Sequence, residues 1–249
     1  MLISAVILAK NEEKNIKDCI GSVKWCDEIV VIDDDSVDKT VEVSKKIGAI
    51  VYEHALENDF AAQRNFGLEK ARGDWIFFID ADERVSANLA FEVQGRLTEN
   101  PENIQGFFVK RVDSMWGKTL KHGETGNISF VRLAKKGAGF WHGKVHEELR
   151  IQGKTSVLHN SLFHFPHQTI TEFLQEINFY TSLRAEELFK QNVKVFWWDI
   201  ILYPKGKFIV NFFLKQGFRD GIEGFILALL MSLHSFLVRG KLWILWHKK

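Results

Sequence analysis

Two aspartates, Asp80 and Asp82, directly follow the apolar run Trp75–Ile79. This run is short for a helix and too apolar for a surface strand, which is typical of a central strand covered on both faces. Side chains two positions apart in an extended segment lie on one side of it, so both carboxylates can face the same ligand. Two close carboxylates on a rigid strand end predict a cation site. The alternative is a polar strand end that caps the next helix.

Two more polar clusters follow predicted strands in the first third of the chain. The sequence Lys-Asn-Glu at 10–12 comes after the apolar segment 2–9, and three aspartates at 33–35 come after the segment 28–32. In open α/β sheets, ligands bind beyond the carboxyl ends of the strands. We therefore expect all three clusters to lie along one edge of a sheet.

The elements that must position these clusters alternate between strands and helices. Strands are predicted at 2–9, 28–32, 49–53 and 75–79, and helices at 11–25, 37–47 and 60–71. This alternation predicts an α/β fold of right-handed, parallel βαβ units with helices on both faces of the sheet. Further along we expect a helix at 88–97, strands at 105–112 and 128–133, a loop with an aromatic tip at 113–123, and an amphipathic helix at 169–191 with a capping box.

The overall charge gives no sign of a nucleic-acid partner, because 33 basic and 32 acidic residues leave a net charge of +1. The apolar N-terminal segment has no charged residue before it, so we expect a strand there and not a signal peptide. The longest apolar stretch, 225–238, includes His234 and is shorter than the ~18 residues of a membrane span. A spanning segment is therefore not expected.

The end of the chain is basic and aromatic. From Val193 onward, nine lysines and arginines face three acidic residues, which gives a local charge of 9 − 3 = +6. Aromatic residues are interleaved with these cations at helical spacing, a pattern that suits an anionic membrane surface. The alternative is a helical hairpin that packs on the rest of the protein or on a second subunit.

Phosphate-binding loops are missing from the sequence. No Gly-x-Gly-x-x-Gly follows the first strand, and no Gly-x-x-x-x-Gly-Lys-Ser/Thr occurs anywhere. If the acidic edge binds a diphosphate, Asp80 and Asp82 must do so through a metal, and Mg²⁺ or Mn²⁺ is expected because hard carboxylates select hard cations. Such an ion would stabilise a departing nucleoside diphosphate.

Four motifs resemble those of family 2 glycosyltransferases, which have the GT-A fold. They are Val6-Ile-Leu-Ala-Lys-Asn-Glu12, Val30-Val-Ile-Asp-Asp-Asp-Ser36, Gln63-Arg-Asn-Phe-Gly67 and Ile79-Asp-Ala-Asp-Glu83. Their order and spacing match the family over about the first third of the chain. Later segments resemble the branch that builds the lipopolysaccharide core: His146-Glu147, His164, and Gly217-Phe-Arg-Asp-Gly221 within the basic aromatic tail.

The resemblance implies roles for individual residues. It places Asn11 and Glu12 at the nucleotide base and ribose, and Asp34 at uracil or an equivalent base, with Asp33 and Asp35 as supporting neighbours. Arg64 would lie at the nucleotide, and Asp80 at the sugar diphosphate and the metal. Asp82 would bind the metal, and His164 the metal or the diphosphate. For Arg64 the alternative is a salt bridge on a helix surface. A lone histidine such as His164 is more often structural.

The family inverts the anomeric centre by direct displacement, which needs a general base near the acceptor hydroxyl. The resemblance points to Glu147, with Glu148 as its rival and a surface glutamate pair as the alternative to both. Trp116 and Trp141 could stack on sugar rings or pack in the core.

The expected protein is a metal-dependent, inverting hexosyltransferase. It would use a nucleotide-diphosphate sugar, expected to be a UDP-sugar, and a lipid-linked or lipopolysaccharide-core saccharide at the cytoplasmic face of the cell membrane. We expect a GT-A domain at 1–168, with a nucleotide-binding half at 1–83 and an acceptor-side half at 84–168, and a helical region at 169–249.

Two other functions remain open at this point. A sugar-1-phosphate nucleotidyltransferase shares the sheet and the metal-bound phosphates, but usually has a glycine-rich basic loop where this chain has Lys-Asn-Glu-Glu at 10–13. A peripheral membrane assembly factor on a retired transferase fold is the non-enzymatic alternative. The sequence does not identify the sugar, the acceptor or the oligomeric state.

Overall fold

The computed structural model describes residues 1–57, 59–99, 103–126, 128–144 and 147–248. The chain forms two compact units. The sheet unit comprises Met1–Arg111 and Ile128–His164, and the helical unit comprises Val112–Asn127 and Phe165–Lys249. The segment Val112–Asn127 thus belongs to the helical unit, whereas the division expected from the sequence kept it with the first domain.

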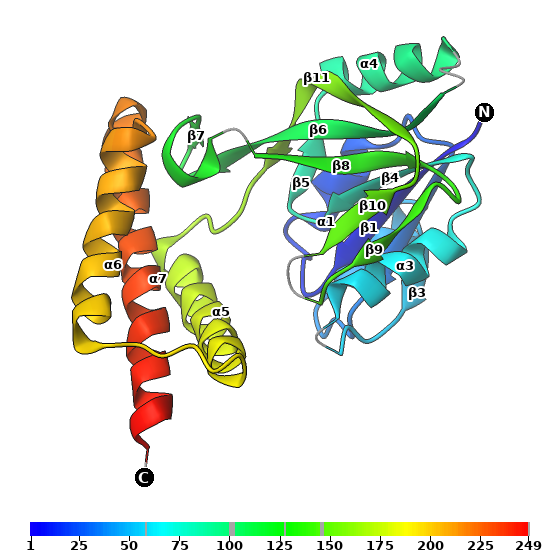
Figure 1. The fold of residues 1–249 in the computed structure, drawn as a ribbon. Helices are drawn as coiled ribbons and strands as arrows, with labels where there is room; N and C mark the ends of the chain where they lie inside the picture. Colours follow the sequence, from blue (N-terminus) through cyan, green and yellow to red (C-terminus); the bar gives the residue numbers. More distant parts are fainter. Residues whose placement is uncertain (58, 100–102, 127, 145–146, 249) are drawn as a thin grey trace. The chain divides into compact units, whose positions relative to one another are not determined.

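The sheet unit contains the predicted alternation of strands and helices (Figure 1). Its first part comprises β1 (Ile3–Ala9), α1 (Ile16–Ser22), β2 (Glu28–Asp33), α2 (Thr40–Lys46), β3 (Ile50–Glu53), α3 (Phe60–Lys70), β4 (Trp75–Asp80), β5 (Glu83–Val85) and α4 (Ala87–Thr98). Its second part comprises β6 (Ile104–Met115), β8 (Ile128–Lys135), β9 (Gly139–His142), β10 (Glu148–Ile151) and β11 (Lys154–His164). The first helix begins five residues later than predicted, because Asn11 has a left-handed backbone (φ +55°) that starts a turn.

The main sheet has the strand order β3-β2-β1-β4-β8-β6-β11-β5. Its first four strands are parallel, and β8 runs antiparallel to both β4 and β6. In the parallel part, Ala9 pairs with Asp33 and Leu8 pairs with Asp80. The three polar clusters therefore follow neighbouring strands along one edge of the sheet, as predicted.

Alternate residues of the central strands pack into two different cores. In β1, Ala5 and Ile7 join a buried cluster with residues of α1 and α4, whereas Val6 joins a second cluster with α3, β9 and β10. In β4, Phe77 and Phe78 divide between the two clusters in the same way. Strands buried on both faces need continuous apolar runs, which the sequence supplies. The predicted α/β class with helices on both faces is confirmed.

The helical unit is built mainly from α5 (Ile170–Lys190), α6 (Trp197–Ile209) and α7 (Gly221–His247). The predicted capping box of α5 is present, since Thr169 Oγ1 accepts from the Glu172 N–H and Glu172 Oε2 accepts from the Thr169 N–H, both at 3.1 Å. A π-helical turn, η2 (Val210–Leu214), continues from α6, and the 3₁₀ turn η3 (Gly217–Asp220) precedes α7.

The loop predicted at 113–123 is instead a hairpin, which corrects the sequence interpretation. β6 continues to Met115, turns through Trp116 and Gly117 at φ +54° and +77°, and returns as β7 (Lys118–Leu120), before the 3₁₀ turn η1 (Gly123–Thr125). Two consecutive left-handed residues form the tight turn that suits a hairpin. The buried Asp220 carboxylate then accepts from the backbone N–H groups of Lys121 and His122. The hairpin is thereby joined to the start of α7.

One helical segment of the described residues, Gly217–His247, is long and apolar enough to cross a membrane by length and composition. The expectation that no segment reaches this length is therefore wrong. The uncharged polar residues Ser232 and Ser235, together with His234, interrupt the apolar run in the sequence without making the helix polar. Only 22% of its most apolar stretch is buried inside the structure.

Candidate active site

Asp80 lies at the end of β4 between two arginines. Arg64 on α3 donates from Nη2 to Asp80 Oδ1 at 2.8 Å, and Arg132 on β8 donates from Nη2 to Oδ2 at 2.9 Å. Both arginines are only 4% exposed. Burial would raise the pKa of Asp80, but the charges and hydrogen bonds of Arg64 and Arg132 hold this pKa well below its ordinary value. The Asp80 carboxylate is therefore ionised and held in place.

Glu83 and Arg132 belong to this cluster, although the sequence analysis gave neither of them a role. Glu83 is fully buried; its Oε2 accepts from the Asp80 N–H, and its Oε1 accepts from Arg132 Nη2 at 2.9 Å. Burial raises the pKa of Glu83, Arg132 lowers it, and the neighbouring Asp80 charge raises it, with a net rise. The sequence did contain a signal for Arg132, because this arginine lies between Val131 and Leu133 in an otherwise apolar predicted strand.

Glu147 joins the same cluster through Arg64. Arg64 Nε donates to Glu147 Oε1 at 2.9 Å, and the guanidinium carbon lies 4.7 Å from the centre of the Trp141 ring. Glu148, the rival residue, is exposed on β10. Arg64 is thus a buried bridge between two carboxylates and not a surface salt bridge. Trp141 is buried, and His146 lies outside the described residues.

Asp82 and His164 form a second pair beside this cluster. His164 ends β11, pairs in register with Glu83 of β5, and has Nε2 at 3.1 Å from Asp82 Oδ2. Among the described residues, no group of three or more His, Cys, Asp or Glu side chains is placed to hold a metal ion. Asp82 and His164 are thus a carboxylate–imidazole pair in contact with each other.

Asp34 lies on the β2 side of the edge and is also held by neighbours. Its Oδ2 lies 2.6 Å from Lys10 Nζ, and its Oδ1 accepts from the Leu56 N–H at 2.8 Å. Asp33 is buried, and its Oδ2 accepts from the Ser36 N–H. Asp35 is exposed with φ +49°. Asp34 therefore presents an oriented carboxylate, while Asp33 shapes the turn.

Asn11 and Glu12 connect the loops after β1 and β2. The Asn11 N–H donates to Ser36 Oγ, and Asn11 Oδ1 accepts from the Val37 N–H, both at 2.8 Å. The Glu12 N–H donates to Thr40 Oγ1 at 2.7 Å, and its carboxylate accepts from Asn15 Nδ2. These bonds place both residues at the same edge as Asp34.

The two arginines carry buried donors without a hydrogen-bond partner among the described residues: Arg64 Nη1, Arg132 Nε and Arg132 Nη1. A buried N–H group that lacks an acceptor costs free energy, and a charged one costs more. Guanidinium groups suit planar, bidentate recognition of phosphate oxygens. The site therefore has spare donors for an anionic ligand.

The family model for glycosyl transferase family 2 matches residues 4–165. The protein belongs to glycosyl transferase family 2. The resemblance stated from the four motifs is therefore confirmed, together with the GT-A fold class. All of the site residues described above lie within the matched range.

Similar proteins include other members of the family. An uncharacterised glycosyltransferase of Rickettsia prowazekii is 28% identical over 252 residues, covering 96% of this chain and 86% of the relative. The lipopolysaccharide core biosynthesis glycosyltransferase LpsC of Rhizobium meliloti is 29% identical over 248 residues, covering 97% of this chain and 92% of LpsC. Both matches extend across the sheet unit and the helical unit.

A solved structure also matches part of this family 2 glycosyltransferase. Glucosyl-3-phosphoglycerate synthase of Mycobacterium tuberculosis, solved with Mn²⁺, UDP and phosphoglyceric acid, is 27% identical with a TM-score of 0.37. The match covers 45% of this chain and 43% of the synthase.

Proposed function

We propose that this family 2 glycosyltransferase transfers a hexose, with inversion, from a UDP-sugar to a lipid-linked or lipopolysaccharide-core saccharide. The observation that carries the proposal is the buried Arg64, which joins Asp80 at the strand end to Glu147. In this arrangement the Arg64 guanidinium, our proposed diphosphate contact, lies beside Glu147, our candidate base. LpsC, a lipopolysaccharide core transferase similar to this chain along nearly its whole length, supports the acceptor class.

The donor would bind along the edge of the parallel strands. Asp34 offers a fixed acceptor for the N3–H of uracil, with Asn11 and Glu12 beside it for the base and ribose. Asp33 and Asp35 support this loop. The spare donors of Arg64 and Arg132 suit the diphosphate, because charge-assisted hydrogen bonds to phosphate are strong.

Two of the residues present, Asp82 and His164, suit a divalent metal as a partial set of ligands. Both Asp80 oxygens accept bonds from arginines, so we assign the ion to Asp82 and His164 with donor phosphate oxygens completing its ligands, and we place Asp80 beside it at the sugar diphosphate. Mg²⁺ and Mn²⁺ accept such a mixture of protein and phosphate ligands. When bound, the ion would supply Lewis-acid stabilisation of the departing UDP.

Glu147 is our candidate for the general base. As the acceptor oxygen bonds to the anomeric carbon and the bond to the diphosphate breaks, the hydroxyl proton would move to the Glu147 carboxylate. Arg64 Nε donates to this carboxylate and keeps it oriented. Glu148 points to a different environment, since it is exposed on β10.

The helical unit suits a peripheral position at the cytoplasmic face of the membrane. Its α6 and η2 expose large apolar side chains, among them Trp197, Trp198, Leu202, Phe213 and Leu214. The region from Val193 onward has a local charge of +6. Apolar surface combined with positive charge favours binding to anionic lipid.

The enzymatic part is tested by calorimetry with UDP and Mn²⁺ and by UDP release from a panel of UDP-sugars. Asp82→Asn should lose metal-dependent UDP binding and transfer, whereas Glu147→Gln should keep UDP binding and lose transfer. The control Asp18→Asn changes an exposed aspartate on α1 and should behave like wild type.

Three results would contradict this function. Full activity of Asp82→Asn would exclude the metal role, and absence of metal-dependent UDP binding in the wild type would favour the assembly factor. Pyrophosphate release from a nucleoside triphosphate and a sugar 1-phosphate would favour the nucleotidyltransferase.

A further inference from the structure

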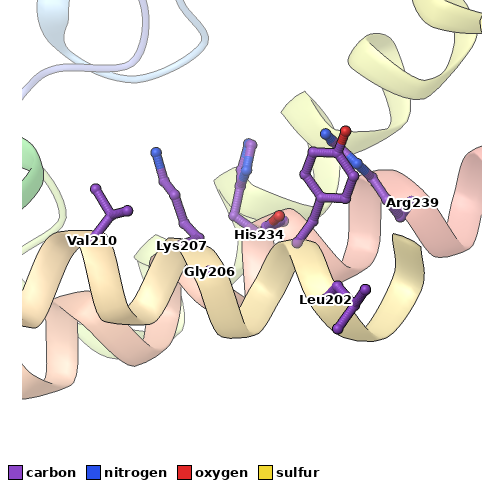
Figure 2. Close-up of a pocket in the computed structure, with 8 residues that line it drawn as sticks. Leu202, Gly206, Lys207, Val210, His234 and Arg239 are labelled. Carbon is purple, nitrogen blue, oxygen red and sulfur yellow. The ribbon is translucent and has the colours of Figure 1, made fainter. Parts of the chain in front are cut away.

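A cavity of about 560 Å³ lies between α6 and α7 within the helical unit. Lys207, His234 and Arg239 line it together with the apolar side chains of Leu202 and Val210. In Figure 2, Lys207, His234 and Arg239 extend toward the same side of the α6 ribbon. The cavity thus combines three basic side chains with apolar walls, and it takes no part in the donor site of the sheet unit.

The cations at this cavity exceed the nearby carboxylates. Arg239 stacks on Tyr203, with the guanidinium carbon 4.1 Å from the ring centre, and has no carboxylate partner among the described residues. Lys207 Nζ lies 2.9 Å from Glu124 Oε1, but Glu124 also faces Lys215 at 3.7 Å. One carboxylate is therefore shared by two lysines, and the Arg239 charge is not balanced.

The pKa of His234 responds first to burial and then to the same cations. Burial lowers the pKa of His234, Lys207 lowers it further, Glu124 raises it, and Arg239 and Lys241 lower it again, with a net fall. An anion placed beside His234 would therefore be attracted by two or more fixed cations in partly desolvated surroundings, where charges interact more strongly than in water.

The surroundings of the cavity are apolar and exposed. Leu202 and Val210 line its wall and are themselves exposed, and Leu229, Leu233 and Phe236 form an exposed stripe on α7. A free inorganic anion would make no favourable contact with these apolar walls. An amphiphile with an anionic head and hydrocarbon chains matches both the cations and the apolar surface.

We propose that this cavity binds the phosphate of an anionic phospholipid headgroup, with Arg239 and Lys207 donating to the phosphate oxygens and the acyl chains lying along Leu202 and Val210. The proposal deepens the membrane association of the proposed function and rests on it. It places one specific lipid contact on a surface that otherwise binds through general charge and apolar contact.

The test is binding of the full chain to phosphatidylcholine vesicles that contain phosphatidic acid, measured by flotation. Arg239→Gln removes a cavity cation, and the matched control Lys205→Gln removes an exposed cation of α6 that does not line the cavity. Loss of one surface charge should weaken binding about fivefold, whereas loss of a charge with a direct phosphate contact should weaken it by at least about 30-fold. Lys207→Gln serves as a second cavity variant, and circular dichroism checks that each variant is folded.

Competition distinguishes the sources of phosphate. Soluble dihexanoyl phosphatidic acid should release the protein from vesicles, and inorganic phosphate at the same concentration should not. Equal release by inorganic phosphate would overturn the lipid assignment, and equal losses in Arg239→Gln, Lys207→Gln and Lys205→Gln would overturn the cavity as a headgroup site. The vesicle assay contains no donor, so a failure of UDP binding would refute the transferase function without changing this comparison.

Discussion

Arg64 connects the residues that the sequence motifs brought together. It was expected at the nucleotide because of its motif, and the structure shows it buried between Asp80 and Glu147, which lie 16 residues after it and 83 residues after it. A guanidinium group in this position can hold one carboxylate beside a donor and orient the other beside an acceptor. The chemistry proposed for the site therefore depends on one side chain from α3.

Asp80→Asn tests the electrostatic part of this cluster through stability. Because the folded-state pKa of Asp80 is depressed, its stabilisation is present above the ordinary aspartate pKa of about 3.9 and is lost as the pH falls through the folded-state value. The substitution should lower the free energy of unfolding by about 2–4 kcal/mol, slightly less than for a fully buried pair. Urea unfolding at pH 7, 5 and 3.5 measures it.

The difference between Asp80→Asn and wild type should be the same at pH 7 and pH 5 and should shrink only below about pH 4. A difference that stays the same down to pH 3.5 would show that the folded-state pKa of Asp80 is close to its ordinary value, against the two-arginine environment.

Arg132→Lys tests the residue that the sequence analysis did not single out. Lysine keeps the charge but loses the planar guanidinium that donates to Asp80 and Glu83 and, in the proposed function, to a phosphate. We expect UDP binding in the presence of Mn²⁺ to weaken by about tenfold, which corresponds to one charge-assisted hydrogen bond. Arg72→Lys, at an exposed arginine paired with Glu28, is the control, and similar UDP affinities of the two variants would contradict a role of Arg132 at the diphosphate.

The motifs predicted the members of the site that follow strands, but not those that support them. Asp80, Asp82 and Asp34 come directly after apolar runs, so their place at one edge follows from the sheet. Arg132 contacts Glu83 across 49 residues; Arg132 lies in a segment that otherwise reads as core, and Glu83 ends an acidic motif that gave it no partner. Pairs of this kind depend on the order of the antiparallel strands, which local patterns do not contain.

Helix α3 must lie close to the sheet for Arg64 to reach Asp80. A β-carbon at Gly67 would lie 2.5 Å from Val6 Cγ1 and 3.2 Å from Ile32 Cγ1, and both of those side chains are buried. Valine and isoleucine are stiff at the first side-chain torsion, so neither can move away easily. Gly67 is thus what allows α3 to approach β1 and β2.

Gly67→Ala should therefore push α3 outward, lower the free energy of unfolding by about 1–3 kcal/mol, and weaken UDP binding through Arg64. Gly95→Ala is a matched control in α4, where nothing lies within 4 Å of the added carbon. That control should stabilise the protein by about 0.5–1 kcal/mol, because alanine is the better helix former. Thermal unfolding of both variants measures this, and a stabilised Gly67→Ala would contradict the close packing.

Elements with strong periodicity were predicted well, and elements that depend on backbone handedness were not. The strands and helices of the βαβ units and the capping box of α5 have local signals. The hairpin of β6 and β7 does not, because a turn with Trp at its first left-handed position lacks the usual Asn-Gly or Asp-Gly pattern. The start of α1 was misplaced for the same reason, since Asn11 is left-handed.

At the scale of the whole molecule, the proposed donor site and the proposed lipid site lie in different units. The sheet unit contains the edge that carries Asp34, Asp80 and Asp82, which is the proposed donor site, and the helical unit contains the cavity and most of the exposed aromatic residues. This division predicts that changes on α6 affect membrane binding and leave UDP binding unaltered. The exposed apolar surface also fits a second protein surface, so the decisive measurement must separate lipid from protein.

The variant Trp197→Ser distinguishes binding to lipid from binding to a second protein. Trp197 is 62% exposed on α6, and Phe91 on α4 of the sheet unit is 79% exposed, so Phe91→Ser removes a similar aromatic surface from the other unit. Loss of an aromatic side chain that inserts at the lipid interface should weaken binding to anionic vesicles about tenfold, whereas Phe91→Ser should have no effect.

Salt should weaken the binding of the wild-type protein to anionic vesicles without abolishing it. Raising the ionic strength from about 0.1 to 1 M shortens the screening length from about 10 to 3 Å but leaves apolar contacts intact.

If Trp197→Ser instead binds vesicles like wild type and changes the sedimentation coefficient of the free protein, the aromatic face of α6 is a protein interface. A charge-only surface would release the protein completely at high salt. Retention at high salt that is lost in Trp197→Ser is therefore the result that requires aromatic insertion as well as charge.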